Sequence, residues 1–113
     1  MSLWSHVIDV NPQIAIAYNN RGTARSDKRL ALSDYSKTIE LDPEFPEAYF
    51  NRGKAYFHFG KYALAIPDFT KCIELDPKDA EALYWRSLSY RHLGLIKESE
   101  LDEKTARAMG FNP

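Results

Sequence analysis

The chain repeats itself at a fixed spacing, and this repetition limits the possible folds more than any other feature. Residues 38–43 read TIELDP, and residues 72–77 read CIELDP at a distance of 34 positions. A second recurring segment occupies residues 17–22 (AYNNRG), 48–53 (AYFNRG) and 82–87 (ALYWRS). A period of this length is typical of stacked supersecondary units, each of which buries its apolar face only against its neighbours. We therefore predict a linear array instead of one central core.

The first full unit is shorter than the next one. The prolines that close the units are Pro12, Pro43 and Pro77, so the first step is three positions shorter than the second. Ala24 and Ala31 lie seven residues apart, whereas the equivalent Ala55 and Ala65 lie ten residues apart. The missing residues therefore fall in the turn inside the unit.

Two segments with helical apolar periodicity, separated by a turn signal, make up each unit. Gly60 and Gly94 supply turn signals, and Pro43 and Pro77 end their units because proline disfavours helical geometry in the residue before it. Pro67 falls inside an expected helix and should delay its start or bend its first turn. The fold is predicted to be all-α, with about seven helices near residues 2–10, 14–26, 29–41, 46–58, 63–75, 80–92 and 96–109.

The middle unit carries the residues of a known repeat pattern. This pattern places aromatic, small and proline residues at set positions, which are here Tyr49, Gly53, Tyr56, Ala65, Phe69 and Pro77. On these residues the chain resembles the tetratricopeptide repeat (TPR) family. It departs from the pattern at Arg52, where Leu is usual, and at Arg25 and Glu103, where aromatic residues are usual. The resemblance implies a right-handed α-solenoid of stacked antiparallel helical hairpins.

The resemblance extends over the whole chain as a single domain. It gives a half repeat with a second helix only, a first repeat that is three residues short, a second repeat, and a third repeat that is degenerate at its end. These parts are residues 1–13, 14–45, 46–79 and 80–113. An array that starts within a repeat is expected to be a piece of a longer protein. The alternative is a natural short protein whose half repeat acts as a cap.

The charge balance argues against a nucleic-acid partner. Fifteen Lys and Arg residues stand against sixteen Asp and Glu residues, which gives a formal net charge of −1, whereas nucleic-acid binders carry a clear basic excess. No apolar run approaches the roughly 18 residues of a membrane-spanning helix, so no membrane partner is expected. A single cysteine forms no internal disulfide, and a cytoplasmic location is the expectation.

No group of residues predicts catalysis. His58 and His92 occupy equivalent places in consecutive repeats, but neighbouring helices lie about 10 Å apart and a metal ion needs ligand nitrogens at about 2 Å, so no metal site is expected. Cys72 occupies a small, apolar position, where an inert buried thiol is typical. The sequence shows no phosphate-binding loop and no Ser/His/Asp pattern. We expect a protein that is not an enzyme and has no cofactor.

Arginine and aspartate recur in register with one another. The aligned positions are Arg21, Arg52 and Arg86 on the first helix of each hairpin, and Asp34, Asp68 and Asp102 on the second. These positions lie at about the same height in an antiparallel hairpin, which predicts an Arg–Asp contact that orients the two helices. The alternative is a groove lined by three arginines that receives an acidic partner.

The resemblance places the binding surface in a concave groove lined by the first helices. Asn20 and Asn51 align, and a row of amides can hydrogen-bond a peptide backbone without reading its sequence. Aromatic side chains nearby are of the kind that anchors interfaces, although some of them could instead pack between repeats. The predicted groove residues are Asn20, Phe50, Asn51, Lys54, Phe57, His58, Tyr84, Trp85 and His92.

One specialised groove is not expected. Co-chaperones of this family grip the C-terminal carboxylate of heat-shock chaperones with a clamp of two Lys, two Asn and one Arg. Asn51 matches one clamp asparagine. The other clamp positions hold Asn19, Thr23, Glu81 and Trp85, none of which is the clamp residue.

The sequence thus predicts a protein–protein interaction module or scaffold that binds a peptide or a partner surface in its groove. Two alternatives stay open. The chain could be a self-associating module whose open ends pair with another copy, or a regulatory or targeting segment of a larger enzyme. A monomer or weak self-association is expected.

Overall fold

A computed structural model describes residues 12–113, and this part of the chain is all-helical, with no strand. Its helices are α2 (Pro12–Ala24), α3 (Lys28–Leu41), α4 (Pro46–His58), α5 (Tyr62–Leu75), α6 (Ala80–His92) and α7 (Ile96–Ala108). The predicted helices after the first agree with these bounds to within two residues at each end. The helix predicted near residues 2–10 lies outside the described residues.

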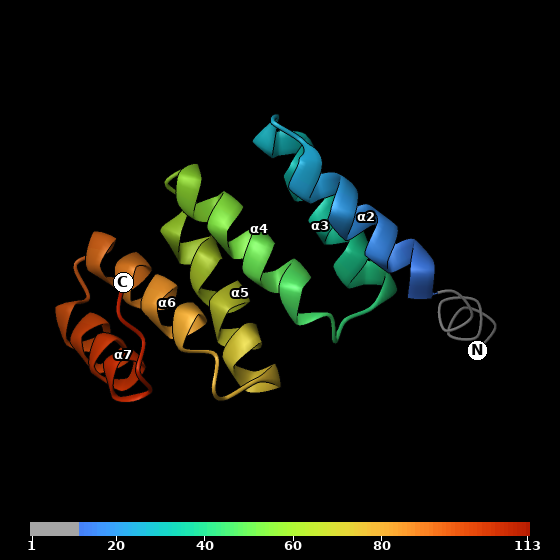
Figure 1. Cartoon of the computed structure of the whole chain (residues 1–113). Helices are drawn as coiled ribbons and strands as arrows, with labels where there is room; N and C mark the ends of the chain where they lie inside the picture. Colours follow the sequence, from blue (N-terminus) through green and yellow to red (C-terminus); the bar gives the residue numbers. More distant parts are fainter. Residues whose placement is uncertain (1–11) are drawn as a thin grey trace, which may run out of the picture.

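The helices form three hairpins stacked in a row (Figure 1). Each hairpin consists of a first helix (α2, α4 or α6) and a second helix (α3, α5 or α7), and each second helix contacts the next first helix. Successive first helices also contact one another, so they line the inner side of the row. The described chain measures 45 × 28 × 25 Å, an elongated shape that confirms the predicted α-solenoid.

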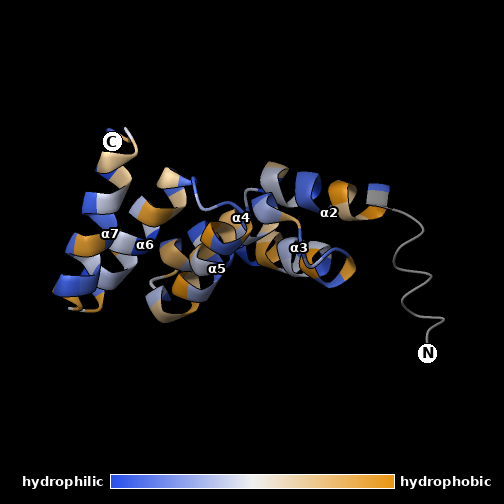
Figure 2. Cartoon of the chain, turned by 90° about the horizontal axis from the view of Figure 1, so that it is seen from below, coloured by the Kyte–Doolittle hydropathy of each residue, from blue (hydrophilic) through white to orange (hydrophobic). Residues whose placement is uncertain are grey.

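Hydrophobic and hydrophilic segments alternate along the helices (Figure 2), as expected for helices that each bury one stripe. The buried stripes meet between hairpins, for example where Tyr49, Cys72 and Ala82 form one core cluster. No helix in the described part of the chain combines the length and the apolarity needed to cross a bilayer.

The turns inside the second and third hairpins depend on glycine. Gly60 and Gly94 have φ angles of 73° and 79°, a left-handed conformation that glycine adopts without steric cost. The residue after each glycine donates its N–H back into the helix, Lys61 to the carbonyl of Tyr56 and Leu95 to that of Tyr90, both at 2.9 Å. These bonds close the helix ends in the Schellman pattern.

The first hairpin, whose turn is three residues shorter, has no glycine there. Instead Asp27 precedes α3, and its side chain accepts a hydrogen bond from the backbone N–H of Arg29 at 3.0 Å. An aspartate at this position satisfies one of the unpaired N–H groups of the first helical turn. The short turn is therefore stabilised by a side-chain cap.

Pro67 does not delay the start of its helix, so this one of its two expected effects is wrong. Helix α5 begins at Tyr62, and Pro67 lies inside it. The carbonyl of Lys61 accepts bonds from Leu64 and Ala65, both at 3.1 Å, so the first turn is complete before the proline is reached. Proline has no backbone N–H, so the carbonyl of Ala63 lacks its usual helical donor. Ala63 and Pro67 are both exposed, and water can donate to this carbonyl instead.

Close packing between the two helices of a hairpin rests on a glycine and an aromatic ring. A Cβ atom placed on Gly22 would lie 2.7 Å from Cε1 of Tyr35, and one on Gly53 would lie 2.8 Å from Cε1 of Phe69. Both distances are far below van der Waals contact. Each glycine therefore allows the ring of the partner helix to lie directly against the helix backbone.

The third hairpin replaces this pair, which explains its degenerate pattern. Ser87 stands in the position of the glycine, and its Oγ lies 3.3 Å from Oγ of the buried Ser99. Glu103 stands in the position of the ring and makes ion pairs with Arg91 at 3.0 Å and Arg107 at 2.9 Å. Without an aromatic ring, the position of the glycine has room for a side chain.

Candidate functional site

The predicted Arg–Asp contact is present in every hairpin. The shortest nitrogen–oxygen distances are 2.7 Å for Arg21 and Asp34, 2.8 Å for Arg52 and Asp68, and 2.7 Å for Arg86 and Asp102. Each arginine binds both carboxylate oxygens of its partner, a geometry that fixes the guanidinium plane. The structural interpretation of the aligned arginines is confirmed.

Two of these arginines also connect neighbouring hairpins. Arg52 donates from Nη1 to Oγ of Ser36 on α3 at 3.2 Å, and Arg86 donates from Nη1 to Oγ1 of Thr70 on α5 at 3.1 Å. One guanidinium thus orients its own hairpin and the preceding one. These side chains are engaged within the solenoid, and they do not form a row of cations in the groove.

The pKa values of Asp34 and Asp68 are shifted in opposite directions, because ion pairing and burial act against each other. Hydrogen bonds from Arg21 lower the pKa of Asp34, and Arg25, which lies 3.2 Å from the same carboxylate, acts in the same direction. Burial raises the pKa of Asp68, although the hydrogen bonds from Arg52 oppose this shift. In the second hairpin the hydrogen bonds from Arg52 thus act against the effect of burial on the carboxyl of Asp68.

Two hollows lie beside α4, and Asn51 lines both of them. The larger one has a volume of about 450 Å³ and is lined by Pro46, Glu47, Phe50, Asn51, Asp76, Asp79 and Glu81. The smaller one has a volume of about 170 Å³ and is lined by Thr23, Lys28, Ala31, Tyr35, Asn51, Lys54, Ala55 and His58. We call the two hollows together the α4 groove. One end of it is acidic, and the other carries lysine side chains.

The amides do not form the predicted row. Nδ2 of Asn51 donates to Oδ1 of Asn19 at 3.2 Å, and Asn19 is buried, whereas Asn20 is exposed. Asn51 and Trp85, which align with Asn20, each face the first helix of the preceding hairpin. Among residues 12–113, α2 has no preceding first helix that Asn20 could face. The sequence analysis placed Asn19 at a clamp position and did not predict its hydrogen bond with Asn51. An amide has two donors and an acceptor, so the bond between Asn51 and Asn19 leaves capacity for a ligand.

Several of the predicted aromatic residues connect the second and third hairpins. The ring centroid of Phe57 lies 5.2 Å from that of Trp85 and 5.4 Å from that of His92. His92 also stacks on Tyr62 at 4.3 Å, and Trp85 lies 6.2 Å from Phe69. The alternative in which aromatic residues pack between repeats is confirmed for Phe57, Trp85 and His92.

The remaining predicted residues separate into two places. Phe50, Lys54 and His58 line the α4 groove, and Nζ of Lys54 lies 4.7 Å from the ring centroid of Phe50. A cation over a ring face is an attractive arrangement that holds the lysine across the middle of the groove. Tyr84 instead packs against Phe111, at 5.2 Å, beyond the end of α7.

The described residues contain no group of three or more His, Cys, Asp or Glu side chains that could hold a metal ion. Cys72 is fully buried, and its Sγ lies 3.5 Å from the carbonyl oxygen of Pro46. Burial raises the pKa of this thiol from 9.0 to about 12. Such a thiol stays protonated at neutral pH, and the thiolate is the reactive form of cysteine.

The thiol of Cys72 is therefore expected to resist modification in the folded protein. A pKa of about 12 lowers the thiolate fraction at neutral pH by about a thousandfold relative to an ordinary thiol. The reaction with an aromatic disulfide reagent, followed by absorbance with and without urea, measures this protection. Labelling of the folded chain at the rate of the unfolded chain would show that Cys72 is accessible.

Models of known families match the repeats that the structure shows. Models described as tetratricopeptide repeat match residues 46–79 and 69–101, and one described as TPR repeat matches residues 30–60. The chain belongs to the tetratricopeptide repeat family. A comparison with curated proteins gave no match.

Solved structures of similar fold include peptide complexes. The second TPR of Spaghetti (RPAP3) bound to the HSP90 peptide SRMEEVD is 28% identical with a TM-score of 0.84, over 88% of this chain and 94% of that one. The second TPR domain of human RPAP3 in complex with the HSP70 peptide SGPTIEEVD is 27% identical with a TM-score of 0.83, over 88% and 86%. MamA is 25% identical with a TM-score of 0.84, over 91% of this chain and 62% of MamA.

Proposed function

We propose that this chain is a protein-interaction module, without catalytic activity, that binds a peptide segment of a partner protein in the α4 groove. The observation that carries the proposal is the position of Asn51 between two hollows of opposite charge. Structures of similar fold that are more than a quarter identical in sequence hold peptides, which supports a peptide as the ligand.

The groove suggests what the peptide looks like. A basic side chain fits the larger hollow, where Glu47 and Glu81 lie. An acidic side chain fits the smaller hollow, beside Lys28 and Lys54. Between them Asn51 can hydrogen-bond the peptide backbone. Because the groove is part of a rigid stack of helices, binding orders little of the protein.

The chaperone peptides of the relatives are not proposed as ligands of this chain. Their sequences end in the acidic residues EEVD. Glu81 lies at the acidic end of the α4 groove, and Trp85 is occupied in the contact between hairpins. Neither side chain is a cation that could form an ion pair with a peptide carboxylate, and Asn51 is the one residue of the five clamp positions that matches the clamp.

The proposal is tested with peptides that are selected from a displayed random library. Their affinities for the protein are then measured by fluorescence anisotropy. We expect the selected peptides to carry a basic and an acidic residue. The Lys54→Glu variant is expected to bind these peptides more weakly. A lost charge-assisted hydrogen bond costs about 1.5–3 kcal/mol, which is about tenfold or more in Kd. Lys71→Glu is the matched control, because Lys71 lies on the second helix α5 and pairs with Glu74.

The peptide SRMEEVD serves as the specificity control, and we expect it to bind more weakly than the selected peptides. Equal affinities of the Lys54→Glu and Lys71→Glu variants would contradict binding in the α4 groove. Folding of every variant is checked by circular dichroism, so that a lost affinity reports on the groove and not on unfolding.

A further inference from the structure

The smaller hollow of the α4 groove collects basic side chains from two helices. Lys28 is the first residue of α3, and Lys54 and His58 lie on one face of α4. All three line the hollow of about 170 Å³, and no described Asp or Glu lines it. Pockets for whole small molecules begin at about 300 Å³, so this hollow fits a single anionic group.

The two lysines are not neutralised within the described part of the chain. Neither Lys28 nor Lys54 forms an ion pair among residues 12–113, whereas every arginine there pairs with a carboxylate. Nζ of Lys54 lies 4.7 Å from the ring centroid of Phe50, a contact that holds the ammonium group in place without cancelling its charge.

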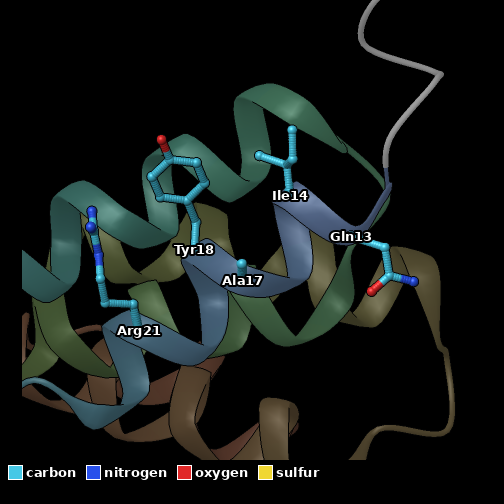
Figure 3. A pocket seen from close by; sticks show the side chains of 5 residues that line it. All are labelled: Gln13, Ile14, Ala17, Tyr18 and Arg21. Atoms are coloured by element: carbon cyan, nitrogen blue, oxygen red, sulfur yellow. The ribbon is translucent and has the colours of Figure 1, made fainter.

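Other hollows on the surface contain cations that are already paired. Arg21 lines the hollow on α2 (Figure 3), and its guanidinium pairs with the carboxylate of Asp34 at 2.7 Å. Arg107 lines a hollow on α7 together with Glu103, with which it pairs at 2.9 Å. The lysines of the smaller hollow have no such partner among the described residues, so their charge is available to a ligand.

The hollow also supplies hydrogen-bond donors around these charges. Each lysine ammonium group has three N–H donors, and a histidine such as His58 donates from at least one ring nitrogen in either protonation state. Asn51 donates one of its two Nδ2–H groups to Asn19 and keeps the other for a ligand. The donors come from α3 and from α4, so an anion in the hollow is held from two sides.

Charge distinguishes between the two kinds of anionic side chain that a peptide can offer. A phosphorylated serine carries a charge of about −1.5 to −2 at pH 7 and has three acceptor oxygens. Two ammonium groups match this charge. A glutamate side chain brings a single negative charge and two oxygens, which would leave one of the two lysines without a counter-ion.

We propose that the smaller hollow binds the phosphate of a phosphoserine in the partner peptide. This inference rests on the proposed function and narrows its ligand, because the acidic residue of the peptide becomes a phosphorylated serine. Lys28 and Lys54 pair with the phosphate oxygens, and Asn51 and His58 complete the set of donors. Phosphorylation of the partner then controls binding, since an unmodified serine brings no charge to the lysines.

Two peptide libraries test the inference, one with a central phosphoserine and one with a central glutamate between random flanking residues. The tightest peptides of each library are compared on the full chain by fluorescence anisotropy. We expect the phosphoserine peptides to bind about tenfold more tightly, as is usual for an added charge-assisted hydrogen bond. Lys28→Gln is expected to remove this preference.

Lys97→Gln is the matched control, because Lys97 is an exposed lysine on α7 that forms no ion pair among the described residues. It is expected to keep the preference, and circular dichroism checks that the variants have equal helix content. Losses of the same size in Lys28→Gln and Lys97→Gln would overturn the inference, because the phosphate would then bind elsewhere.

The remaining outcomes separate this inference from the proposed function. Glutamate peptides that bind as tightly as phosphoserine peptides would overturn the phosphate site and leave peptide binding in the α4 groove standing. Failure of both libraries to bind would overturn the proposed function as well. Displacement of a phosphoserine peptide by an equal concentration of inorganic phosphate would also overturn the inference, because the hollow would then bind the free ion and not a peptide.

Discussion

Replacement of Phe69 by alanine is expected to lower the free energy of unfolding by about 3–5 kcal/mol, as is usual for the loss of a buried aromatic side chain. Phe69 is 0% exposed, and its ring lies against the backbone at Gly53. It also contacts Phe50 at 6.0 Å and Trp85 at 6.2 Å between ring centroids. The variant therefore loses packing within its own hairpin and with the next one.

Urea unfolding followed by circular dichroism measures this loss. Glu103→Ala provides the matched control, because Glu103 stands at the equivalent position of the third hairpin but pairs with arginines near the surface. We expect the control substitution to lower the free energy of unfolding by less than about 1 kcal/mol, which is the upper end of the range for exposed ion pairs. Similar losses in the two variants would show that the ring does not hold the hairpins together.

Gly53→Ala is expected to destabilise the protein by about 1–3 kcal/mol, the usual cost of overpacking a core. The substitution would normally favour a helix by about 1 kcal/mol. Here the new Cβ atom would lie 2.8 Å from Cε1 of Phe69, and the fully buried ring has no room to move away. Steric conflict is therefore expected to outweigh the gain in helix propensity.

Two further variants locate the cause of this effect. Ser87→Ala at the equivalent position of the third hairpin introduces no steric conflict, because no ring lies there, and it is expected to cost only the hydrogen bond to the buried Ser99. The double variant Phe69→Leu with Gly53→Ala is expected to lose less free energy of unfolding than the two single variants lose together. The smaller leucine side chain leaves room for the new methyl group. A stabilising effect of Gly53→Ala alone would contradict the argument.

Much of the fold could be predicted because its determinants recur at the repeat spacing. Turn glycines, closing prolines and small residues return after 34 positions, and local chemistry fixes their roles. Arg52 and Asp68 could be paired for the same reason, since they recur with Arg86 and Asp102 and an antiparallel hairpin brings each pair to one height. Such contacts depend on the geometry of one hairpin.

Contacts between hairpins could not be predicted in the same way. They depend on how far each hairpin rotates relative to the one before, and the pattern within one repeat does not contain that angle. The sequence therefore suggested Asn20 as the partner of Asn51 in a row of amides, whereas the structure pairs Asn51 with its neighbour Asn19. It also could not separate Phe57 and Trp85, which join hairpins, from the residues that line the α4 groove.

The replacement of the ring by Glu103 in the third hairpin affects the order in which the helices separate on unfolding. In a linear stack the loss of an end hairpin breaks only one interface, so melting can start at an end and stop there. Ser87 and Glu103 bury less apolar surface than Gly53 and Phe69 at the equivalent positions, which is expected to make the hairpin of α6 and α7 less stable than that of α4 and α5. We therefore expect the contacts between α6 and α7 to open more readily than those of the second hairpin, which carries the groove.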